Sequence, residues 1–280
     1  MRRTKIIATL GPATDNPDTL GKLIAAGADV VRVNFSHGKA GDRERRVRMV
    51  REVAERAGKY IAVLGDLQGP KIRIQRCRDG SVQLEDGQHF ILDPDLDPDA
   101  GSIEGVGVAY PTLSKDVGKG DVLLLDDGFI TLTVERVTGT EIHCIVTQGG
   151  RLADNKGINK QGGGMSAPAL TDKDREDVRR AAALGVDWLA VSFVSCADDL
   201  HETRALLREA GGTALLVAKI ERTEAIANLE SIIDASDAVM VARGDLGVEM
   251  GYARLTGLQK KILKMTRNRH KVAITATQML

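Results

Sequence analysis

The sequence predicts an α/β fold in which repeated strand–helix units form a parallel barrel, interrupted once by a small all-β unit. Seven apolar strands recur along the 280 residues in a strand–helix rhythm that breaks only after the third strand. Units of this kind indicate a parallel sheet with right-handed crossovers. Polar residues stand at all the carboxyl ends, which favours a barrel with one shared mouth over an open doubly wound sheet. The patterns GxGxxG after the first strand and GxxxxGK[ST] are absent, which excludes the usual dinucleotide and P-loop sites.

The composition is that of a soluble globular protein, with 42% hydrophobic and 28% charged residues. Lys plus Arg and Asp plus Glu both number 39, and aromatic residues are only 3%, so no nucleic-acid or membrane partner is predicted. No apolar run reaches the roughly 18 residues of a membrane helix. Cys77, Cys144 and Cys196 lie far apart without CxxC spacing, which indicates packing roles in a reducing compartment and therefore the cytoplasm.

Local signals predict the elements before the interruption. The predicted strands are Lys5–Leu10, Asp29–Phe35 and Ile61–Leu67. Between the first two, Asn16 and Pro17 supply a helix N-cap and a first-turn proline, and Gly27 supplies a C-terminal stop. The charged segment Asp42–Ala57 repeats valine at helical spacing and is predicted to be the second helix.

From about residue 69 to 166 the helical periodicity disappears, and short β-rich runs alternate with turn residues such as Gly128 and Gly139. Asp93–Asp99, DPDLDPD, resembles a calcium loop in composition but lacks the glycine and terminal glutamate of an EF-hand, so we interpret it as a solvated loop. We therefore predict a discontinuous barrel domain, 1–69 and 167–280, with an inserted all-β domain at 70–166.

Strand–helix alternation resumes at Thr171, which begins a helix to Ala183 in a pattern close to a capping box with Asp174. Gly185 supplies the stop. The remaining strands are predicted at 188–194, 215–221, 238–242 and 272–278, and the remaining helices at 197–210, around 226–233 and in one long stretch around 255–265.

Two buried strands that end in charge, LLVAKIE at 215–221 and VMVARGD at 239–245, predict the functional site. Residues two apart on a strand share a face, so Lys219 and Glu221 point the same way. Asp245 closes the second run, and Gly244 beside it lets a ligand approach the backbone. A cation and two carboxylates on neighbouring strand ends indicate a site for a divalent metal and an anionic ligand. An ion pair that only seals a strand end remains the alternative.

The other strand ends extend this pattern. Their polar residues are Thr9, Arg32, Asn34, Asp66, Ser192 and Thr277. In a barrel all of them face the same mouth, although Asp66 alone is also explained as a strand-end cap.

Eight motifs, spread over the whole chain, carry a family resemblance. They are TKIIATLGPAT at 4–14, VRVNFSHG at 31–38, GDLQGPKIR at 65–73, NKGIN at 155–159, VSF at 191–193, AKIE at 218–221, VARGDLGVE at 241–249 and TATQML at 275–280. With them the sequence resembles the pyruvate kinase family. The resemblance implies a TIM barrel with a small β-barrel domain inserted after strand three, and a glycolytic transferase that converts phosphoenolpyruvate and ADP to pyruvate and ATP. In-line phosphoryl transfer is then followed by protonation of enolpyruvate.

The resemblance also implies a role for each matching residue. Glu221 and Asp245 would hold Mg²⁺ or Mn²⁺, and Lys219, Arg32 and Thr277 would be catalytic. Arg32, Ser192, Lys219, Gly244, Asp245 and Thr277 would bind phosphoenolpyruvate, and Thr9, Asn34, His37, Arg73 and Lys156 would bind the nucleotide. Lys156 would reach in from the inserted domain, which makes that domain a lid that excludes water. Taken alone, His37 is also explained as a loop histidine, and Arg73 and Lys156 as surface charges.

Two departures from the family pattern carry expectations. Family members bind a monovalent cation at positions matching Asn34, Ser36, Asp66 and Leu67, with glutamate where this chain has Lys71. An ammonium from Lys71 near that site would replace K⁺, so activity with little K⁺ dependence is expected. The family barrel has eight strands and a further C-terminal domain, whereas the sequence ends in strand seven; open strand edges and poor stability or inactivity of the 280-residue chain are therefore expected. The family also implies a homo-oligomer for a full-length protein.

Two other functions stay open. A metal-dependent aldolase or lyase of pyruvate-like acids shares the Lys/Glu strand end, and the missing eighth strand favours an inactive fragment that only binds ligands. The residues at 9–12, Arg73 and the inserted domain favour the kinase.

Overall fold

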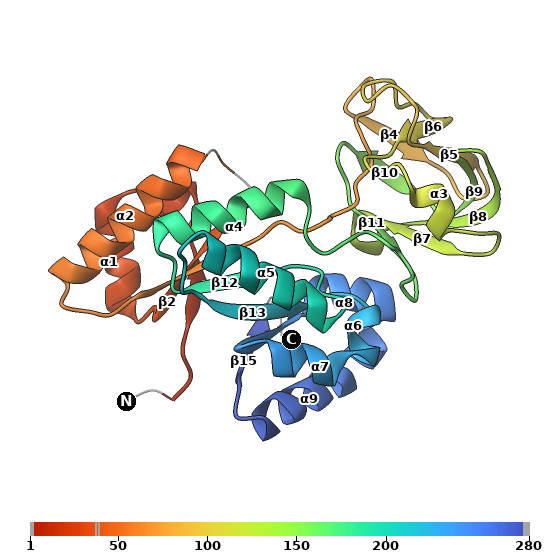
Figure 1. Ribbon diagram of the computed structural model, residues 1–280. Coiled ribbons are helices and arrows are strands. Elements are labelled where there is room, and N and C mark those ends of the chain that lie inside the picture. Colours follow the sequence, from red (N-terminus) through yellow and green to blue (C-terminus); the bar gives the residue numbers. More distant parts are fainter. Residues whose placement is uncertain (1–2, 37, 39, 277–280) are drawn as a thin grey trace.

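The computed structural model describes residues 3–36, 38 and 40–276. Within them a parallel sheet of seven strands curls through the larger part of the molecule (Figure 1). Its order is β1 (Ile7–Thr9), β2 (Val30–Asn34), β3 (Ala62–Asp66), β12 (Trp188–Val191), β13 (Leu215–Ile220), β14 (Ala238–Ala242) and β15 (Val272–Ala276). The predicted α/β class, the parallel pairing and the interruption after the third strand are confirmed. Over the described residues the sheet stays open between β1 and β15.

Helices connect these strands and pack outside the sheet. They are α1 (Pro17–Ala26), α2 (Ala40–Arg56), α4 (Asp172–Leu184), α5 (Ala197–Glu209), α6 (Glu224–Ala227), α7 (Leu229–Ala235), α8 (Arg243–Met250) and α9 (Tyr252–Asn268). Asn16 caps α1 by accepting a hydrogen bond from the Thr19 amide at 2.8 Å, and left-handed Gly27 ends the helix. Thr171 and Asp174 form the predicted capping box of α4.

Some predicted boundaries were wrong. The long helix predicted around 255–265 is confirmed as α9, but the short helix α8 before it was not predicted; Gly251, with φ +81°, separates the two. The helix predicted around 226–233 is likewise divided at Asn228 into α6 and α7. Strand β12 ends at Val191 and not at Val194, because Phe193 takes a left-handed backbone that leaves the ladder.

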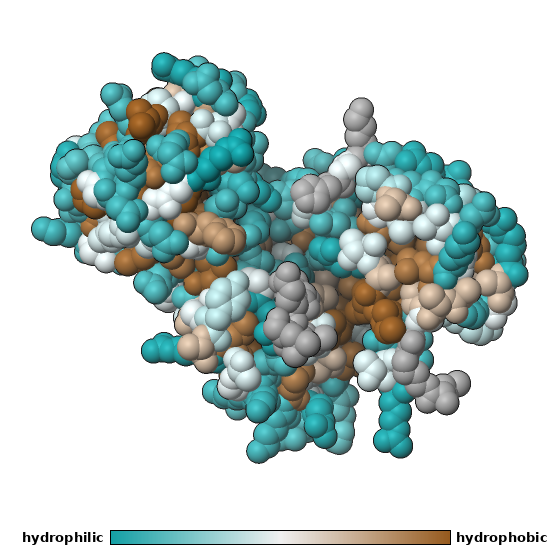
Figure 2. Space-filling view, turned by 180° about the vertical axis from the view of Figure 1, so that it is seen from behind, coloured by the Kyte–Doolittle hydropathy of each residue, from teal (hydrophilic) through white to brown (hydrophobic). Residues whose placement is uncertain are grey.

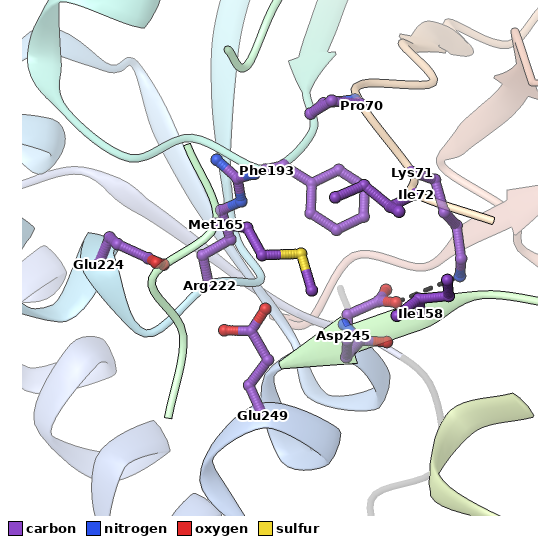
Figure 3. A pocket seen from close by; sticks show the side chains of 11 residues that line it. Pro70, Lys71, Ile72, Ile158, Met165, Phe193, Arg222, Glu224, Asp245 and Glu249 are labelled. Carbon is purple, nitrogen blue, oxygen red and sulfur yellow. Dashed lines mark hydrogen bonds and ion pairs between the residues drawn. The ribbon is translucent and has the colours of Figure 1, made fainter. Parts of the chain in front are cut away.

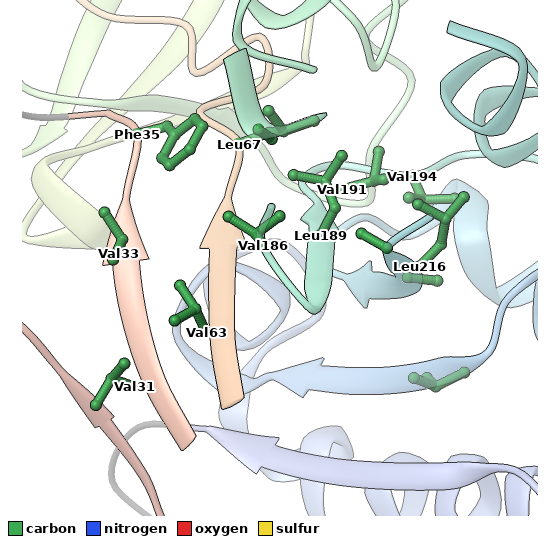
Figure 4. Close-up of a cluster of buried hydrophobic side chains, with 14 of the residues drawn as sticks. Val31, Val33, Phe35, Val63, Leu67, Val186, Leu189, Val191, Val194 and Leu216 are labelled. Carbon is green, nitrogen blue, oxygen red and sulfur yellow. The ribbon is translucent and has the colours of Figure 1, made fainter. Parts of the chain in front are cut away.

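Both faces of the middle strands β3, β12, β13 and β14 are largely buried, as their uninterrupted apolar runs predicted, whereas the edge strands β1 and β15 are partly exposed. The outer face packs against the helices through Val31, Val33, Val63, Leu189 and Leu216, which Figure 4 shows along successive strands. The inner face presents a second cluster that includes Leu64, Ala190 and Val217. Because Val63 and Leu64 are neighbours on opposite faces, the alternation of the strand determines which cluster each joins.

At the amino ends of the strands, exposed apolar residues lie beside charged residues. Ile6, Leu215 and Val272 are exposed at these amino ends, and the view in Figure 2 shows hydrophobic patches at the surface. A hollow of about 1190 Å³ is lined by residues of β1 and β15, including Ile7 and Ile274.

The chain between β3 and α4 forms a separate β-rich unit with its own core (Figure 1). One sheet has the order β11 (Ile158–Lys160), β7 (Val122–Leu125), β8 (Ile130–Thr138), β9 (Glu141–Gln148), β5 (His89–Asp93) and β6 (Gly105–Gly107), and β10 (Gly150–Ala153) pairs with β4 (Ser81–Leu84). A short helix, α3 (Leu113–Asp116), was not predicted. Gly139 adopts φ +63° in the turn from β8 to β9. The domain boundaries at 69/70 and 166/167 stay a prediction.

No helix in the described part of the chain is long and apolar enough to cross a membrane. The three cysteines are free thiols.

Candidate active site

The ammonium group of Lys219 lies at the centre of a polar cluster at the carboxyl ends of the strands. Lys219 comes from the end of β13, and its side chain is only 12% exposed. Its Nζ donates to Ser192 Oγ at 2.6 Å and lies 3.0 Å from Glu221 Oε1 and 3.2 Å from Asp66 Oδ1. Period-two alternation places Lys219 and Glu221 on one face, as the sequence predicted, and curling of the sheet brings Asp66 of β3 to the same ammonium.

Asp66 connects this cluster to the first two strands. Its Oδ2 accepts a hydrogen bond from Arg32 Nε at 2.6 Å, and Arg32 Nη1 donates to Thr9 Oγ1 at 3.1 Å. Ser192 Oγ is 2.8 Å from the carbonyl oxygen of Leu67. The cluster therefore runs without a break from β1 to β13, and both of its cations share the carboxylate of Asp66.

Burial and the charge of the partner have opposite effects on the pKa values of Lys219 and Glu221. Burial lowers the pKa of Lys219, but the charges of Glu221 and Asp66 outweigh burial and raise it overall, so the ammonium stays protonated. Burial raises the pKa of Glu221, Lys219 opposes this, and the charges of Asp245 and Asp66 add to the rise. The carboxylates thus repel one another, and an additional cation would stabilise their ionised forms.

Asp245 lies in the first turn of α8, where its Oδ1 is 3.2 Å from Lys71 Nζ (Figure 3). The described ion pair of Lys71 is with Asp245, and the expectation that its ammonium also lies near Asn34, Ser36, Asp66 and Leu67 stays a prediction. Lys71 follows Gly69 and Pro70 on the segment that enters the inserted unit, and this segment turns it toward α8. A Cβ atom on neighbouring Gly244 would meet no atom within 4 Å, so this backbone is open to a ligand.

Glu221 is held by the backbone as well as by Lys219. Its Oε2 accepts a hydrogen bond of 2.7 Å from the amide of Phe193. Phe193 has φ +55°, a conformation that costs a bulky residue of order 1–3 kcal/mol and is kept only where the surroundings enforce it.

The donor set fits a divalent cation that completes its shell with water and substrate. Glu221 lies close enough to Asp245 for the charge of Asp245 to raise the pKa of Glu221. Among the described residues, no three of His, Cys, Asp and Glu converge as a metal cage. Magnesium is commonly bound by one or two carboxylates together with water and phosphate oxygens, which is the arrangement that two carboxylates allow.

Comparison with known proteins assigns the chain to a family. Residues 1–280 match the family model "Pyruvate kinase, barrel domain". The chain belongs to the pyruvate kinase family. It is 53% identical to pyruvate kinase II of Salmonella typhimurium, 52% to pyruvate kinase of Haemophilus influenzae and 43% to pyruvate kinase of Mycobacterium tuberculosis. Each match covers 100% of the chain, which spans 59% of the length of each of these relatives.

Of the residues that the family resemblance selected, one group is brought together by direct contacts. It consists of Thr9, Arg32, Asp66, Leu67, Ser192, Lys219 and Glu221. Asn34 and Ser36 lie at the adjacent end of β2, where Asn34 Oδ1 accepts the Ser36 amide at 2.9 Å and the amide of Phe35 donates to the Asp66 carbonyl at 2.8 Å. His37 and Thr277 lie outside the described residues.

The two nucleotide-binding residues predicted in the inserted unit lie near each other there. Arg73 pairs with Gly157 in a β-bridge, and its Nη1 donates to the carbonyl of Asn155 at 2.8 Å. Lys156 Nζ lies 2.8 Å from Asp126 Oδ1. These contacts hold Arg73 and Lys156 close together within the inserted unit. None of these contacts is with the Lys219 cluster.

The sequence analysis missed the groups that join the inserted unit to the barrel. The buried carboxylate of Asp174 accepts the amide of Gly69 at 3.1 Å through Oδ1 and that of Thr171 at 3.0 Å through Oδ2, so it ties both crossings of the chain. Arg222 Nη1 donates to Ala167 O at 2.9 Å. The Gly-Pro pair at 69–70 was a visible signal of the first crossing, but nothing local indicated its partner 105 residues away.

Glu249 lines a pocket together with Lys71, Phe193 and Asp245, and its carboxyl group predicts a pH dependence of stability. Burial raises the pKa of this carboxyl from 4.5 to about 7, although the Thr223 amide donates to it at 2.9 Å. A carboxyl group whose pKa is raised on folding stabilises the folded state fully at pH values below its pKa in the unfolded chain. This stabilisation is lost as the pH rises through its pKa in the folded state. We expect Glu249→Gln to gain about 3 kcal/mol of unfolding free energy relative to the unsubstituted chain between pH 4.5 and pH 8.

Urea unfolding at a series of pH values measures this difference. Glu55→Gln, on the exposed face of α2, controls for the loss of one surface carboxylate. A difference between Glu249→Gln and the unsubstituted chain that stays constant from pH 4.5 to 8 would contradict the raised pKa.

Proposed function

We propose that this chain carries the site that transfers the phosphoryl group of phosphoenolpyruvate to ADP, giving pyruvate and ATP in glycolysis. The single observation that carries the proposal is the buried ammonium of Lys219 at the strand ends, in contact with Ser192 and two carboxylates. A fixed, dehydrated cation beside carboxylates that can hold a metal suits a reaction in which charge moves between phosphate oxygens.

The residues divide this task by position. Lys219 and Arg32 stabilise charge on the oxygens of the transferring group, since both cations are already oriented by Asp66. Ser192 and the open backbone at Gly244 bind the remaining oxygens of phosphoenolpyruvate. Glu221 and Asp245 would hold Mg²⁺ or Mn²⁺, which when bound would neutralise charge on the phosphate and carboxylate of the substrate. Thr277 is proposed to position the group that protonates enolpyruvate.

The nucleotide is proposed to bind along Thr9, Asn34 and His37, with Arg73 and Lys156 added from the inserted unit. In this proposal the unit acts as a lid that closes over the nucleotide and excludes water. Contacts at its base support this function, because Glu249 O accepts the Gly162 amide at 3.0 Å and Glu224 accepts the Gly164 amide. For the longer protein we propose the cytoplasm and a homo-oligomer.

A coupled assay tests the proposal by following pyruvate from phosphoenolpyruvate, ADP and Mg²⁺. Protein in excess over substrate keeps a slow chain measurable in a single turnover. ADP-dependent pyruvate formation supports the kinase, whereas cleavage or aldol condensation of a pyruvate-like acid without ADP would indicate the lyase. A chain that only binds ligands would form no pyruvate but would still melt at a higher temperature with Mg²⁺ and phosphoenolpyruvate.

The ammonium of Lys71 predicts independence from K⁺. A fixed positive charge near the substrate takes the place of a bound monovalent cation, so we expect similar pyruvate formation in K⁺ and in tetramethylammonium buffer. Lys71→Met is expected to lower the tetramethylammonium rate about tenfold, equivalent to about 1.4 kcal/mol of charge stabilisation, with partial recovery in K⁺. Lys115→Met, an exposed lysine of the inserted unit, is the control. Strong K⁺ stimulation of the unsubstituted chain would show that Lys71 does not replace the ion.

A further inference from the structure

The backbone of Phe193 is exceptional among the described residues. The other non-glycine residues with positive φ are Asp126, Asp127, Asn155 and His270, which are residue types that tolerate this conformation. Phe193 is a bulky aromatic residue with φ +55° and is only 8% exposed. A conformation of this kind, kept at a strand end beside the polar cluster, points to a task for that residue.

The backbone of Phe193 directs its amide onto Glu221. Strand β12 ends two residues earlier, and the amide donates to Glu221 Oε2 at 2.7 Å instead of continuing the ladder. The other carboxylate oxygen, Oε1, lies 3.0 Å from Lys219 Nζ. The orientation of Glu221 is therefore defined from one side by Lys219 and from the other by Phe193.

The ring of Phe193 packs on the segment where the chain crosses to the inserted unit. A Cβ atom on Gly69 would lie 2.8 Å from Phe193 Cδ2 and 2.9 Å from Ser192 Cβ, so backbone and ring are in close contact there. The Gly69 amide is itself bound to Asp174. Arg222 lies 5.8 Å from the ring centroid, and Phe193 shares its pocket with Pro70, Lys71 and Ile72 (Figure 3).

We propose that Phe193 is a positioning residue that couples the hinge of the inserted unit to the orientation of Glu221. Packing of the ring against Gly69 and Arg222 holds the backbone left-handed, and this conformation keeps the amide on the carboxylate. A hinge movement that shifts Gly69 displaces the ring and releases Glu221. The inference rests on the proposed metal-binding role of Glu221 and extends it, because it makes metal affinity depend on the position of the lid.

Two substitutions of Phe193 separate backbone direction from general stability. Phe193→Ala removes the ring but keeps the steric penalty of a left-handed residue, so the amide leaves Glu221 and Mn²⁺ affinity falls about tenfold, as for loss of a group that orients a metal ligand. Phe193→Gly also lacks the ring but adopts positive φ freely, so it retains more Mn²⁺ affinity than Phe193→Ala. Glycine is also less strained than alanine at φ +55°, so the Mn²⁺ affinities of the two variants are compared only where circular dichroism shows both to be folded. Phe193→Tyr keeps the ring and binds Mn²⁺ like the unsubstituted chain.

A substitution at Gly69, in the hinge segment where the chain crosses to the inserted unit, tests the proposal independently. Gly69→Ala forces a Cβ atom against Phe193 and is expected to weaken Mn²⁺ binding. Gly58→Ala is the matched control, since Gly58 has φ +60° against +67° at Gly69 but a Cβ there would meet nothing within 4 Å. Both substitutions carry the same backbone penalty, and only the first touches the ring.

Titration of the 280-residue chain with Mn²⁺, followed by electron paramagnetic resonance, reads all variants without requiring turnover. The inference is overturned if Phe193→Ala binds Mn²⁺ as tightly as the unsubstituted chain, or if Phe193→Gly binds no more tightly than Phe193→Ala. Should circular dichroism show Phe193→Ala unfolded, Phe193→Leu replaces it, because leucine keeps Cβ and apolar bulk without the ring. Glu221→Gln distinguishes failure of the proposed metal role of Glu221 from failure of the coupling. Unchanged Mn²⁺ affinity in Glu221→Gln would contradict the metal role itself. Lost Mn²⁺ affinity in Glu221→Gln, with normal affinity in the Phe193 and Gly69 variants, would contradict only the coupling.

Discussion

Lys219→Met is expected to lower the single-turnover rate of pyruvate formation by about 10²–10³-fold, the usual effect of removing a preorganised group that stabilises developing charge. Methionine matches the length and apolar stem of lysine but has no charge to offer the transferring oxygens. Of the described cations nearby, Arg32 is already bound to Asp66 and Lys71 to Asp245, so neither is oriented to replace the Lys219 ammonium.

Loss of Lys219 also affects stability. Glu221 and Asp66 are 3% and 2% exposed in their side chains, and removing the ammonium leaves them with less compensation. Breaking a buried ion pair on one side costs about 3–5 kcal/mol, so urea unfolding at pH 7 is expected to show a loss of that order. Protonation of Glu221 makes the loss smaller at pH 5, since burial already raises the pKa of this carboxyl.

Lys173→Met is the matched control for both measurements. Lys173 Nζ lies 2.6 Å from Asp177, a carboxylate whose side chain is 1% exposed, but it has no contact with the Lys219 cluster. It therefore also removes an ammonium from a buried carboxylate, but Lys173 is 45% exposed and Asp177 keeps Arg43 at 2.9 Å, so a smaller loss of stability is expected than for Lys219→Met. Equal rate losses in Lys173→Met and Lys219→Met would mean that the rate reports folding and not charge stabilisation at the site.

Glu221→Gln is expected to weaken Mn²⁺ binding by more than the roughly 10- to 100-fold lost when only an outer partner of a metal ligand is removed. An amide keeps the shape of the side chain and can still accept the Phe193 hydrogen bond, but it carries no negative charge for the metal. Unfolding free energy is expected to fall much less than in Lys219→Met, because Asp66 still lies 3.2 Å from Lys219 and the cost of burying an ionised Glu221 disappears.

Titration with Mn²⁺ and urea unfolding of the same preparation measure the two effects together. Glu249→Gln is the control, since Glu249 is also buried and lines the pocket that contains Asp245, but it binds Thr223 and not Lys219. Unchanged Mn²⁺ affinity in Glu221→Gln, or an equal loss in Glu249→Gln, would remove Glu221 as a metal ligand.

The ion pair of Lys71 is a contact that the family pattern could not predict. The position of Lys71 in the motif suggested only the monovalent-cation positions at the ends of β2 and β3, which stays a prediction, and gave no sign of the ion pair with Asp245 on α8, 174 residues later. The direction of that side chain depends on how the segment from Gly69 to Ile72 leaves the barrel. That path depends in turn on Asp174 and Phe193, which no local pattern connects to Lys71.

Residue order alone was enough to predict the strand–helix rhythm, the caps at Asn16 and Thr171, and the shared direction of Lys219 and Glu221. These features depend on interactions between residues that are at most four positions apart, so their signals are local. Tertiary packing determined which distant groups meet. Asp66 contacts Arg32 and Lys219, and the amide of Phe193 donates to Glu221. Asp174 accepts from the amides of Gly69 and Thr171, where the chain leaves and re-enters the barrel. Such contacts arise from curling of the sheet and burial of its neighbours, because only in the folded chain do residues tens to more than a hundred positions apart come within hydrogen-bond distance.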